Sequence, residues 1–427
     1  MDTRPRTLAL AAPLTALAML VAACGGSGFQ EADGGEEAAE DGATDVAEGD
    51  GADAGVDLQL MGFSSSPAED EQLSAIIETY NEQSSNTATF NPVPEYDTTL
   101  QAALAGGEPP DVFYVDSNRL PDLVEAGTLM PAEGQLDDET DFYPSLVEAF
   151  TYDDQFWCPP KDFSTLALQY NVPLLEEAGI SPPTDWDELA VAAEALTTDD
   201  RAGLVLGTEY PRWGAFMFQN GGAVTDEGFT EMTASSEPNT AAFAYLEDLY
   251  ANGYAATAAD LDAGWPGEAF GQEKAAMTIE GNWMVGAMRN DFPDLDWATA
   301  ELPVGPEGPA TFAFTVCYAV PSNAANPAAS WDLVNYLVSP EQQLEYTKNF
   351  PVMPSRESIA DDWLEANPDL EPYLNGATYA RPFQFVPGFQ AALDVLNDGI
   401  QGIAAGNREV DEVLEDTDEA GQPILGG

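Results

Sequence analysis

From Val56 onwards, short apolar segments alternate with segments whose apolar residues recur at helical spacing. "VDLQLMGF" has the pattern of a strand, and the helix expected after it carries Leu73, Ile76, Ile77 and Tyr80 on one face. "TATFNPV" and "DVFYVD" are the next expected strands, and a helix ended by glycines separates them. Such alternation predicts a parallel or mixed sheet covered by helices.

The same alternation recurs later in the chain, where "STLALQYN", "GLVLG" and "KAAMTIEG" are expected strands. "PTDWDELAVAAEALTT" is an expected helix with Thr184 as its N-cap. Gly127 fits the position after a helix C-cap, and Ser339 followed by Gln342 has a capping-box pattern. For a chain of 427 residues, two α/β lobes are the expected organisation.

The charge balance excludes several classes of function. The chain has 12 basic and 76 acidic residues, a net charge of -64 and no histidine. Nucleic-acid binding is excluded because phosphate contacts need Lys and Arg, and an anionic membrane surface would repel the chain. Without histidine there is no Ser-His-Asp triad and no His-ligated metal, although chemistry by paired carboxylates stays open.

The acidity itself has two interpretations. The carboxylates are spread along the chain, which favours a solvated surface adapted to a salty medium over a cation-binding or cation-transporting function. Salt screens such repulsion, so we expect the melting temperature to fall on dialysis into low salt.

The first residues have the pattern of a secretion signal. Arg4 and Arg6 precede an apolar run, Leu8–Ala22, that is too short to span a bilayer. The run ends in "VAAC", which resembles a bacterial lipobox, so we expect a signal peptide over 1–23 and a lipid on Cys24. Cleavage without lipidation is the alternative. Residues 24–55 are rich in Gly, Ala and acids, which predicts an extended tether between a lipid anchor and the globular body.

Two cysteines, Cys158 and Cys317, remain in the body of the chain. An even number in an oxidising compartment predicts a disulfide, and two buried free thiols are the alternative.

Several segments between about residue 57 and residue 415 share patterns with one known family. They are "AALAGGEPPDVFYVDSNRLPDLVEAGTLMPAEGQL", "LALQYNVPLLEEAGISPPTDWDEL", "EAFGQEKAAMTIEGNWMVGAM", "ELPVGPEG" and "NPAASWDLVNYLVSPEQQLEYTKNFPVMPSRES". Their content and order resemble the carbohydrate-binding branch of the solute-binding proteins of ABC transporters, the family of maltose-binding protein.

The resemblance implies a two-lobed α/β fold of the periplasmic-binding-protein type, with a central ligand cleft and three crossings between the lobes. The expected lobes are 56–163 plus 314–360 and 164–313 plus 361–427. The crossings are expected near Asp162–Thr165, Thr311–Val316 and Ile359–Asp362. The family further implies a monomer that closes around a sugar or oligosaccharide and delivers it to permease subunits at the outer face of the membrane. No catalytic residue, cofactor or metal is implied.

The resemblance also suggests which residues contact the ligand, because sugars need aromatic faces and planar polar groups. Candidates in the first lobe and the hinge are Ser64, Ser65, Asp116, Ser117, Lys161, Asp162 and Ser164. Candidates in the second lobe are Glu209, Tyr210, Arg212, Trp213, Trp265, Glu268, Trp283, Phe385 and Phe389. The alternatives are an N-cap role for Asp116, a solvated loop at 209–213, and core packing for Trp283, Phe385 and Phe389.

By the same resemblance, the opening of the hinge lies in "FWCPPKDFSTLALQYN", and Cys317 follows the second crossing. If the two hinge strands run side by side, Cys158 and Cys317 come within the Cα separation of about 4.4–6.8 Å that a disulfide requires. Ser164 stands where the family often has a carboxylate, and Asp162 is the expected substitute.

Two further functions remain as alternatives. One is a receptor for a non-sugar solute, such as a polyol phosphate or a polyamine. The other is an extracellular glycosidase, which would need a carboxylic acid with a raised pKa and a second carboxylate at a set distance.

Overall fold

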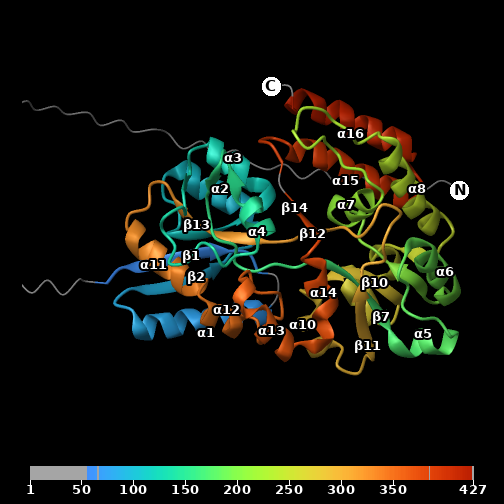
Figure 1. Ribbon diagram of the computed structural model, residues 1–427, viewed down its shortest axis with the longest axis horizontal. Helices are drawn as coiled ribbons and strands as arrows, with labels where there is room; N and C mark the ends of the chain where they lie inside the picture. The colour runs from blue at the N-terminus through green and yellow to red at the C-terminus, as the bar shows by residue number, and fades with distance from the viewer. Residues whose placement is uncertain (1–54, 65–66, 384, 426–427) are drawn as a thin grey trace, which may run out of the picture. The chain divides into compact units, whose positions relative to one another are not determined.

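The computed structural model of the protein describes residues 55–64, 67–383 and 385–425 (Figure 1). The expected signal peptide, Cys24 and almost all of the expected tether lie outside the described residues, as does Ser65. Within the described ranges, no helix is both long and apolar enough to cross a bilayer.

Two five-stranded sheets organise the fold. The strands of the first sheet, in spatial order, are β2 (Thr87–Pro92), β1 (Asp57–Gly62), β3 (Val112–Asp116), β13 (Val316–Pro321) and β4 (Leu129–Met130). β1 pairs in parallel with β2 and β3, whereas β13 runs antiparallel to both β3 and β4. The expectation of a mixed sheet is thus confirmed for this half of the molecule.

The second sheet has the spatial order β11 (Trp297–Glu301), β7 (Leu166–Asn171), β10 (Ala275–Gly281), β8 (Ala202–Val205) and β9 (Ala255–Ala256). β8 is parallel to β9 and β10, and β7 is antiparallel to β10 and β11. Two small two-stranded sheets join β12 (Thr311–Ala313) to β14 (Ala380–Pro382), and β5 (Thr151–Tyr152) to β6 (Gln155–Phe156).

Helices cover these sheets. The first sheet lies between α1 on one side and α2 and α3 on the other (Figure 1). The helices up to α8 are α1 (Pro67–Gln83), α2 (Tyr96–Gly106), α3 (Leu120–Glu125), α4 (Pro144–Ala149), α5 (Val172–Ala178), α6 (Trp186–Leu196), α7 (Tyr210–Gln219) and α8 (Glu237–Ala251). The later helices are α9 (Pro266–Gly271), α10 (Met284–Asp291), α11 (Pro327–Leu337), α12 (Pro340–Tyr346), α13 (Ala360–Ala366), α14 (Glu371–Gly376), α15 (Gln390–Ala404) and α16 (Val410–Leu425).

The chain path makes the molecule two-lobed. After β4 of the first sheet and the small β5–β6 sheet, the chain builds all strands of the second sheet, and it then returns with β13 to lie beside β3. Each sheet has its own apolar core: Leu73, Ile76, Ile77 and Tyr80 of α1 are buried in the first, as their spacing predicted. A separate core packs α6, α7, α8, α15 and α16 on the second sheet.

Helix ends follow the capping signals with one exception. The Ser339 side chain accepts a hydrogen bond from the Gln342 amide, and Gly127 has a positive φ of 66° just after the end of α3. The prediction of Thr184 as an N-cap was wrong by one residue. Asp185 caps α6, because its carboxylate accepts from the Glu188 amide at 2.8 Å, while the Thr184 hydroxyl donates to the Glu188 side chain.

Candidate functional site

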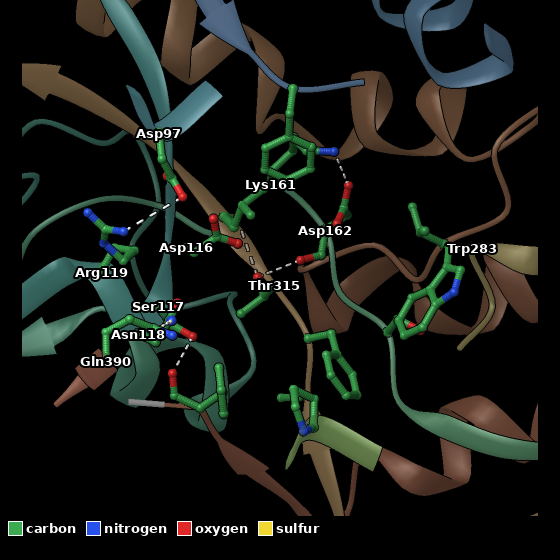
Figure 2. Close-up of a pocket in the computed structure, with 18 of the residues that line it drawn as sticks. Asp97, Asp116, Ser117, Asn118, Arg119, Lys161, Asp162, Trp283, Thr315 and Gln390 are labelled. Atoms are coloured by element: carbon green, nitrogen blue, oxygen red, sulfur yellow. Dashed lines mark hydrogen bonds and ion pairs between the residues drawn. The ribbon is translucent and has the colours of Figure 1, made fainter. Parts of the chain in front are cut away.

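A cavity of about 610 Å³ is lined by residues of the first sheet, of the segments that join the two sheets, and of α7, α15 and the loop after β10 (Figure 2). Its polar lining residues include Asp97, Asp116, Ser117, Asn118, Arg119, Lys161, Asp162, Ser164, Thr315, Gln390 and Asp394. Its aromatic lining residues are Phe63, Trp283, Phe314, Phe350 and Phe383. Its size and mixed lining are those of a site for a small organic solute.

Three segments that connect the two sheets run side by side beneath this cavity. The first contains residues 161–164, the second residues 314–316 and the third Met353. The Lys161 amide donates to the Val316 carbonyl at 2.8 Å, and the amides of Ser164 and Phe314 each donate to the other's carbonyl. Phe163 and Met353 exchange backbone hydrogen bonds in the same way, each at 3.0 Å. The third segment therefore pairs with the first at Met353, slightly before the range 359–362 expected from the resemblance.

Asp116 ends the central strand β3 at the wall of the cavity opposite Trp283 (Figure 2). It precedes the short 3₁₀ helix η1 (Ser117–Arg119), but its side chain makes no capping hydrogen bond, so the alternative role as an N-cap does not apply. Burial, and then the nearby charge of Asp97, raise the pKa of Asp116 to about 6, while Arg119 opposes the shift. Asp116 is thus a half-buried carboxylate at the tip of a strand.

The residues after Asp116 bond to the segment before α15 and to the first residue of α15. The Ser117 hydroxyl donates to the Phe383 carbonyl at 2.7 Å, and the Asn118 amide group donates to Gln390 at 3.0 Å. Ser117 therefore lines the cavity with its hydroxyl already engaged. Gln390 is engaged at both side-chain atoms, because it also donates to Asp394, whereas the side-chain oxygen of Asn118 can accept from another partner.

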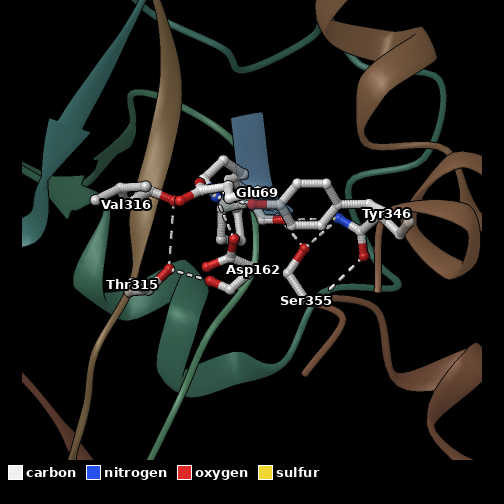
Figure 3. A network of polar contacts seen from close by, with 9 residues as sticks. Glu69, Asp162, Thr315, Val316, Tyr346 and Ser355 are labelled. Atoms are coloured by element: carbon white, nitrogen blue, oxygen red, sulfur yellow. Dashed lines mark hydrogen bonds and ion pairs between the residues drawn. The ribbon is translucent and has the colours of Figure 1, made fainter. Parts of the chain in front are cut away.

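Lys161 is the centre of a buried polar network, which we call the Lys161 cluster: Lys161, Glu69, Asp162 and Tyr346. Figure 3 labels Glu69, Asp162 and Tyr346 of this cluster. The ammonium group lies 2.9 Å from the Glu69 carboxylate and also bonds to Asp162 and to the Tyr346 hydroxyl. The Tyr346 hydroxyl donates in turn to Glu69 at 2.8 Å. Burial disfavours the charge on Lys161, but Asp162 and Glu69 outweigh burial and raise its pKa, so it is a cation held by two carboxylates.

The backbone around this cluster is also fixed by side chains. The Thr315 hydroxyl donates to the Asp162 carbonyl at 2.6 Å, and the Ser355 hydroxyl donates to the Pro160 carbonyl at 2.7 Å (Figure 3). Lys161 and Asp162 both line the cavity, yet their charges are largely used within the protein.

The disulfide is confirmed. Cys158 and Cys317 are bonded, and their Cα atoms lie 5.6 Å apart. Both cysteines are fully buried, and Pro160 bridges to Cys317 across the first and second connecting segments. The bond therefore joins the first connecting segment to the start of β13.

Trp283 forms the opposite wall of the cavity (Figure 2). It lies two residues after the end of β10, and its ring lies back over Gly281, where a Cβ atom would come within 2.1 Å of the ring. The indole N–H donates to the Glu280 carboxylate at 3.0 Å, and the ring packs edge-on against Phe314. Trp283 is half-buried, not a core residue, and glycine at position 281 is needed for its orientation.

Behind Trp283 lies a second ionic group, the Arg212 cluster: the buried Glu280 and the partly exposed Arg212 and Glu209. The guanidinium bonds to Glu280 at 2.7 Å and to Glu209 at 3.1 Å, and its carbon lies 5.1 Å from the centre of the Trp283 ring. Burial raises the pKa of Glu209, and Arg212 opposes the shift. Glu280 thus holds both Arg212 and the Trp283 indole.

The remaining candidate residues do not line this cavity. Tyr210, Trp213, Phe385 and Phe389 are buried in the core of the second sheet, where Phe385 stacks on Phe389 and Trp213 packs against Phe243. The segment 209–213 is no solvated loop either, because α7 begins at Tyr210 and buries Tyr210 and Trp213 in its apolar face.

Three other candidates have different surroundings. The Ser64 hydroxyl donates to Asp70, and Glu268 accepts from the Gly264 amide. Trp265 lines a different cavity, of about 680 Å³, between the loops after β8 and β9. Of the residues predicted from the sequence to contact the ligand, six line the cavity between Asp116 and Trp283: Asp116, Ser117, Lys161, Asp162, Ser164 and Trp283.

The cavity also contains residues that the sequence patterns did not indicate as contacts: Asp97, Asn118, Phe314, Phe350, Gln390 and Asp394. Phe314 could have been predicted from the sequence, since it lies within the second expected crossing, Thr311–Val316. Gln390 and Asp394 belong to α15, whose helical pattern indicates core packing for its other face.

A model of the bacterial extracellular solute-binding protein family matches residues 75–372, more than half of the 427-residue chain. The chain belongs to this family. It is similar over 358 residues to a Brucella abortus protein, with 26% identity and coverage of 79% of this chain and 86% of the relative.

Solved structures with the same fold include sugar-binding proteins. The GacH receptor of Streptomyces glaucescens, solved without ligand and with acarbose, has a TM-score of 0.78 at 23% identity, over 87% of this chain and 98% of that chain. The cyclic α-maltosyl-1,6-maltose binding protein of Arthrobacter globiformis has a TM-score of 0.75 at 25% identity, over 87% of this chain and 99% of that one.

Proposed function

We propose that this extracellular solute-binding protein captures a sugar or oligosaccharide in the cavity between Asp116 and Trp283 and delivers it to the permease of an ABC importer. The two lobes, 56–163 plus 314–360 and 164–313 plus 361–427, would close over the solute by bending of the three connecting segments. The protein acts as a monomer, held at the outer face of the membrane by a lipid on Cys24.

The lining of the cavity carries this proposal. Aromatic rings from both sides, Phe63 and Trp283 among them, provide faces for the C–H surfaces of a sugar ring. Carboxylates and amides between them, such as Asp116 and Asn118, provide acceptors and donors for hydroxyl groups. Sugar-binding proteins from Streptomyces glaucescens and Arthrobacter globiformis share the fold, which supports the same class of ligand here.

We propose binding without catalysis. A glycosidase needs one protonated carboxylic acid and a second carboxylate flanking the scissile bond. Asp116, whose pKa is raised to about 6, is the residue that could act as such an acid, so the glycosidase alternative needs a direct test. If the protein only binds, a bound oligosaccharide should be recovered unchanged after long incubation. Hydrolysis that Asp116→Asn abolishes would establish the enzyme instead.

The solute class is tested by a thermal-shift screen of sugars, oligosaccharides, polyols, polyamines and phosphate esters in high salt. A ligand at 100 times its dissociation constant stabilises a protein by ~2.7 kcal/mol, which shifts the melting temperature by several degrees. We expect saccharides to produce the shift. A shift with only polyamines or only phosphate esters would contradict a sugar receptor.

A further inference from the structure

The cavity is acidic as well as aromatic. The charged residues that line it are Asp97, Asp116, Asp162, Asp394, Arg119 and Lys161, which is four carboxylates against two cations. The whole chain adds a net charge of -64. Such a field concentrates cations and repels anions at the entrance of a cleft.

Each cation of the cavity already lies beside a carboxylate, Lys161 in hydrogen-bonding contact and Arg119 at a longer distance. Lys161 is held by Glu69 and Asp162, and the guanidinium of Arg119 lies 3.7 Å from the Asp97 carboxylate. A phosphate or carboxylate group on the solute would have to compete with these carboxylates, so anionic solutes are disfavoured.

Asp116 is the carboxylate without such a partner. Asp162 is paired with Lys161, Asp97 with Arg119, and the exposed Asp394 accepts from Gln390. Across the described residues, no donor bonds to the Asp116 side chain. A half-buried carboxylate with no hydrogen bond gains most from a charged donor, because charge-assisted hydrogen bonds are about twice as strong as neutral ones.

The aromatic lining favours the same kind of group. Phe63, Trp283, Phe314, Phe350 and Phe383 surround the cavity, and ammonium groups are attracted to aromatic faces. Carboxylate and rings together provide both features of an ammonium-binding site.

We propose that the preferred solute is a saccharide that carries a protonated amine, and that Asp116 is the residue that pairs with it. This inference rests on the proposed function, since it specifies the class of sugar. It excludes phosphorylated and acidic sugars as ligands.

The test compares saccharides with and without a protonated amine, by calorimetric titration at pH 7 in high salt. The β-linked pair is the glucosamine trisaccharide and its fully N-acetylated form, with cellotriose as a third probe. The α-linked pair is maltotriose and its 6-amino-6-deoxy derivative, whose primary amine is protonated at pH 7. In a pair that binds, we expect the amine to bind about tenfold or more tightly, as one charged hydrogen bond provides.

Equal or weaker binding of the amines would overturn the inference while the sugar receptor stands. Binding of spermidine or choline with no saccharide bound would overturn both the inference and the proposed function. Phosphorylated sugars that bind as tightly as neutral ones would also overturn the inference.

The residue is tested by Asp116→Asn, which keeps the shape and removes the charge. We expect the preference for amine over neutral saccharide to fall to about one, and circular dichroism checks that the variant is folded. Glu176→Gln on α5 is the matched control, since it removes one exposed carboxylate that does not line the cavity. Loss of preference in both variants, or in neither, would rule out Asp116 as the partner.

The pH dependence provides an independent readout. The titratable groups that face Asp116 are Asp97 and Tyr96 on α2 and Arg119 on η1. Because the pKa of Asp116 is about 6, its charge is present at pH 7 and mostly lost at pH 5. Affinity for the amine should therefore fall about tenfold between pH 7 and pH 5, while affinity for the neutral saccharide should change less. Parallel changes for both probes would contradict pairing at Asp116.

Discussion

The Lys161 cluster and the Arg212 cluster are both ionic groups beneath the cavity, but their surroundings differ. The side chains of Lys161 and Glu69 are 4% and 1% exposed, and the cluster joins α1, the first connecting segment and α12. Arg212 is 16% exposed and Glu209 38%, and their cluster joins α7 to β10 and the Trp283 ring.

The difference indicates separate tasks. Three segments far apart in the sequence meet at Lys161, so its charge holds the first lobe to the connecting segments. Arg212 and Glu280 instead support one face of the cavity, because Glu280 bonds to both the guanidinium and the Trp283 indole. Loss of the first cluster should chiefly reduce stability, and loss of the second should chiefly reduce ligand affinity.

The largest expected effect is that of Lys161→Met. It leaves Glu69 and Asp162 buried without their cation, which should lower the free energy of unfolding by ~3–5 kcal/mol. Denaturant unfolding in high salt measures this. The matched control is Lys348→Met, whose side chain is 62% exposed and which should change stability by less than about 0.5 kcal/mol. Equal effects of the two substitutions would contradict the structural role of Lys161.

The disulfide should stabilise the same region as the Lys161 cluster, since it joins residues 159 positions apart beside the first connecting segment. Replacing both Cys158 and Cys317 by alanine should lower the free energy of unfolding by ~2–4 kcal/mol. Unfolding of the oxidised and the reduced wild-type protein should differ by a similar amount. No difference in either comparison would show that the bond contributes little to stability.

In contrast to Lys161→Met, Arg212→Met should reduce ligand affinity more than stability. Trp283 would lose the cation stacked on its ring and Glu280 its charge partner, so we expect saccharide affinity to fall about tenfold, which is ~1.4 kcal/mol. The ratio of affinity loss to stability loss should be larger for Arg212→Met than for Lys161→Met. The same ratio in both variants would remove the distinction between the clusters.

Salt should change the contribution of the two clusters to stability less than it changes the repulsion among the exposed carboxylates. The pairs Lys161–Glu69 and Arg212–Glu280 are mostly buried and therefore weakly screened, whereas the exposed carboxylates repel one another when salt is removed. We expect the melting temperatures of wild type and Lys161→Met to fall together, by the same number of degrees, between molar and low salt. A wild-type melting temperature independent of salt would contradict a repulsive acidic surface.

Sequence patterns predicted the fold better than the site. Helical spacing in α1 and the Ser339 cap depend on neighbouring residues, so they were predictable from the sequence. The bonds from Glu69 to Lys161 and from Tyr346 to Glu69 cross 92 and 277 residues, and no local pattern indicates them. The disulfide was predictable because the chain offers one pairing in its body.

The aromatic candidates show most clearly why ligand contacts could not be predicted from the sequence alone. Trp213 and Trp283 both follow polar residues near a strand end, so their sequence contexts look alike. Trp213 lies within the first turns of α7 and is buried, whereas Gly281 lets Trp283 lie back over β10 and line the cavity. Which aromatic residue faces the solute thus depends on where a helix begins.

The central claim is that Trp283 forms the wall of a saccharide site, and calorimetric titration of Trp283→Ala with a bound saccharide tests it most directly. Trp157→Ala is the matched control, because Trp157 is also half-buried but does not line the cavity. We expect Trp283→Ala to lose about 30-fold or more in affinity, as for a central aromatic contact, and Trp157→Ala to lose less than about threefold. Equal losses in the two variants, or unchanged affinity in Trp283→Ala, would contradict the account.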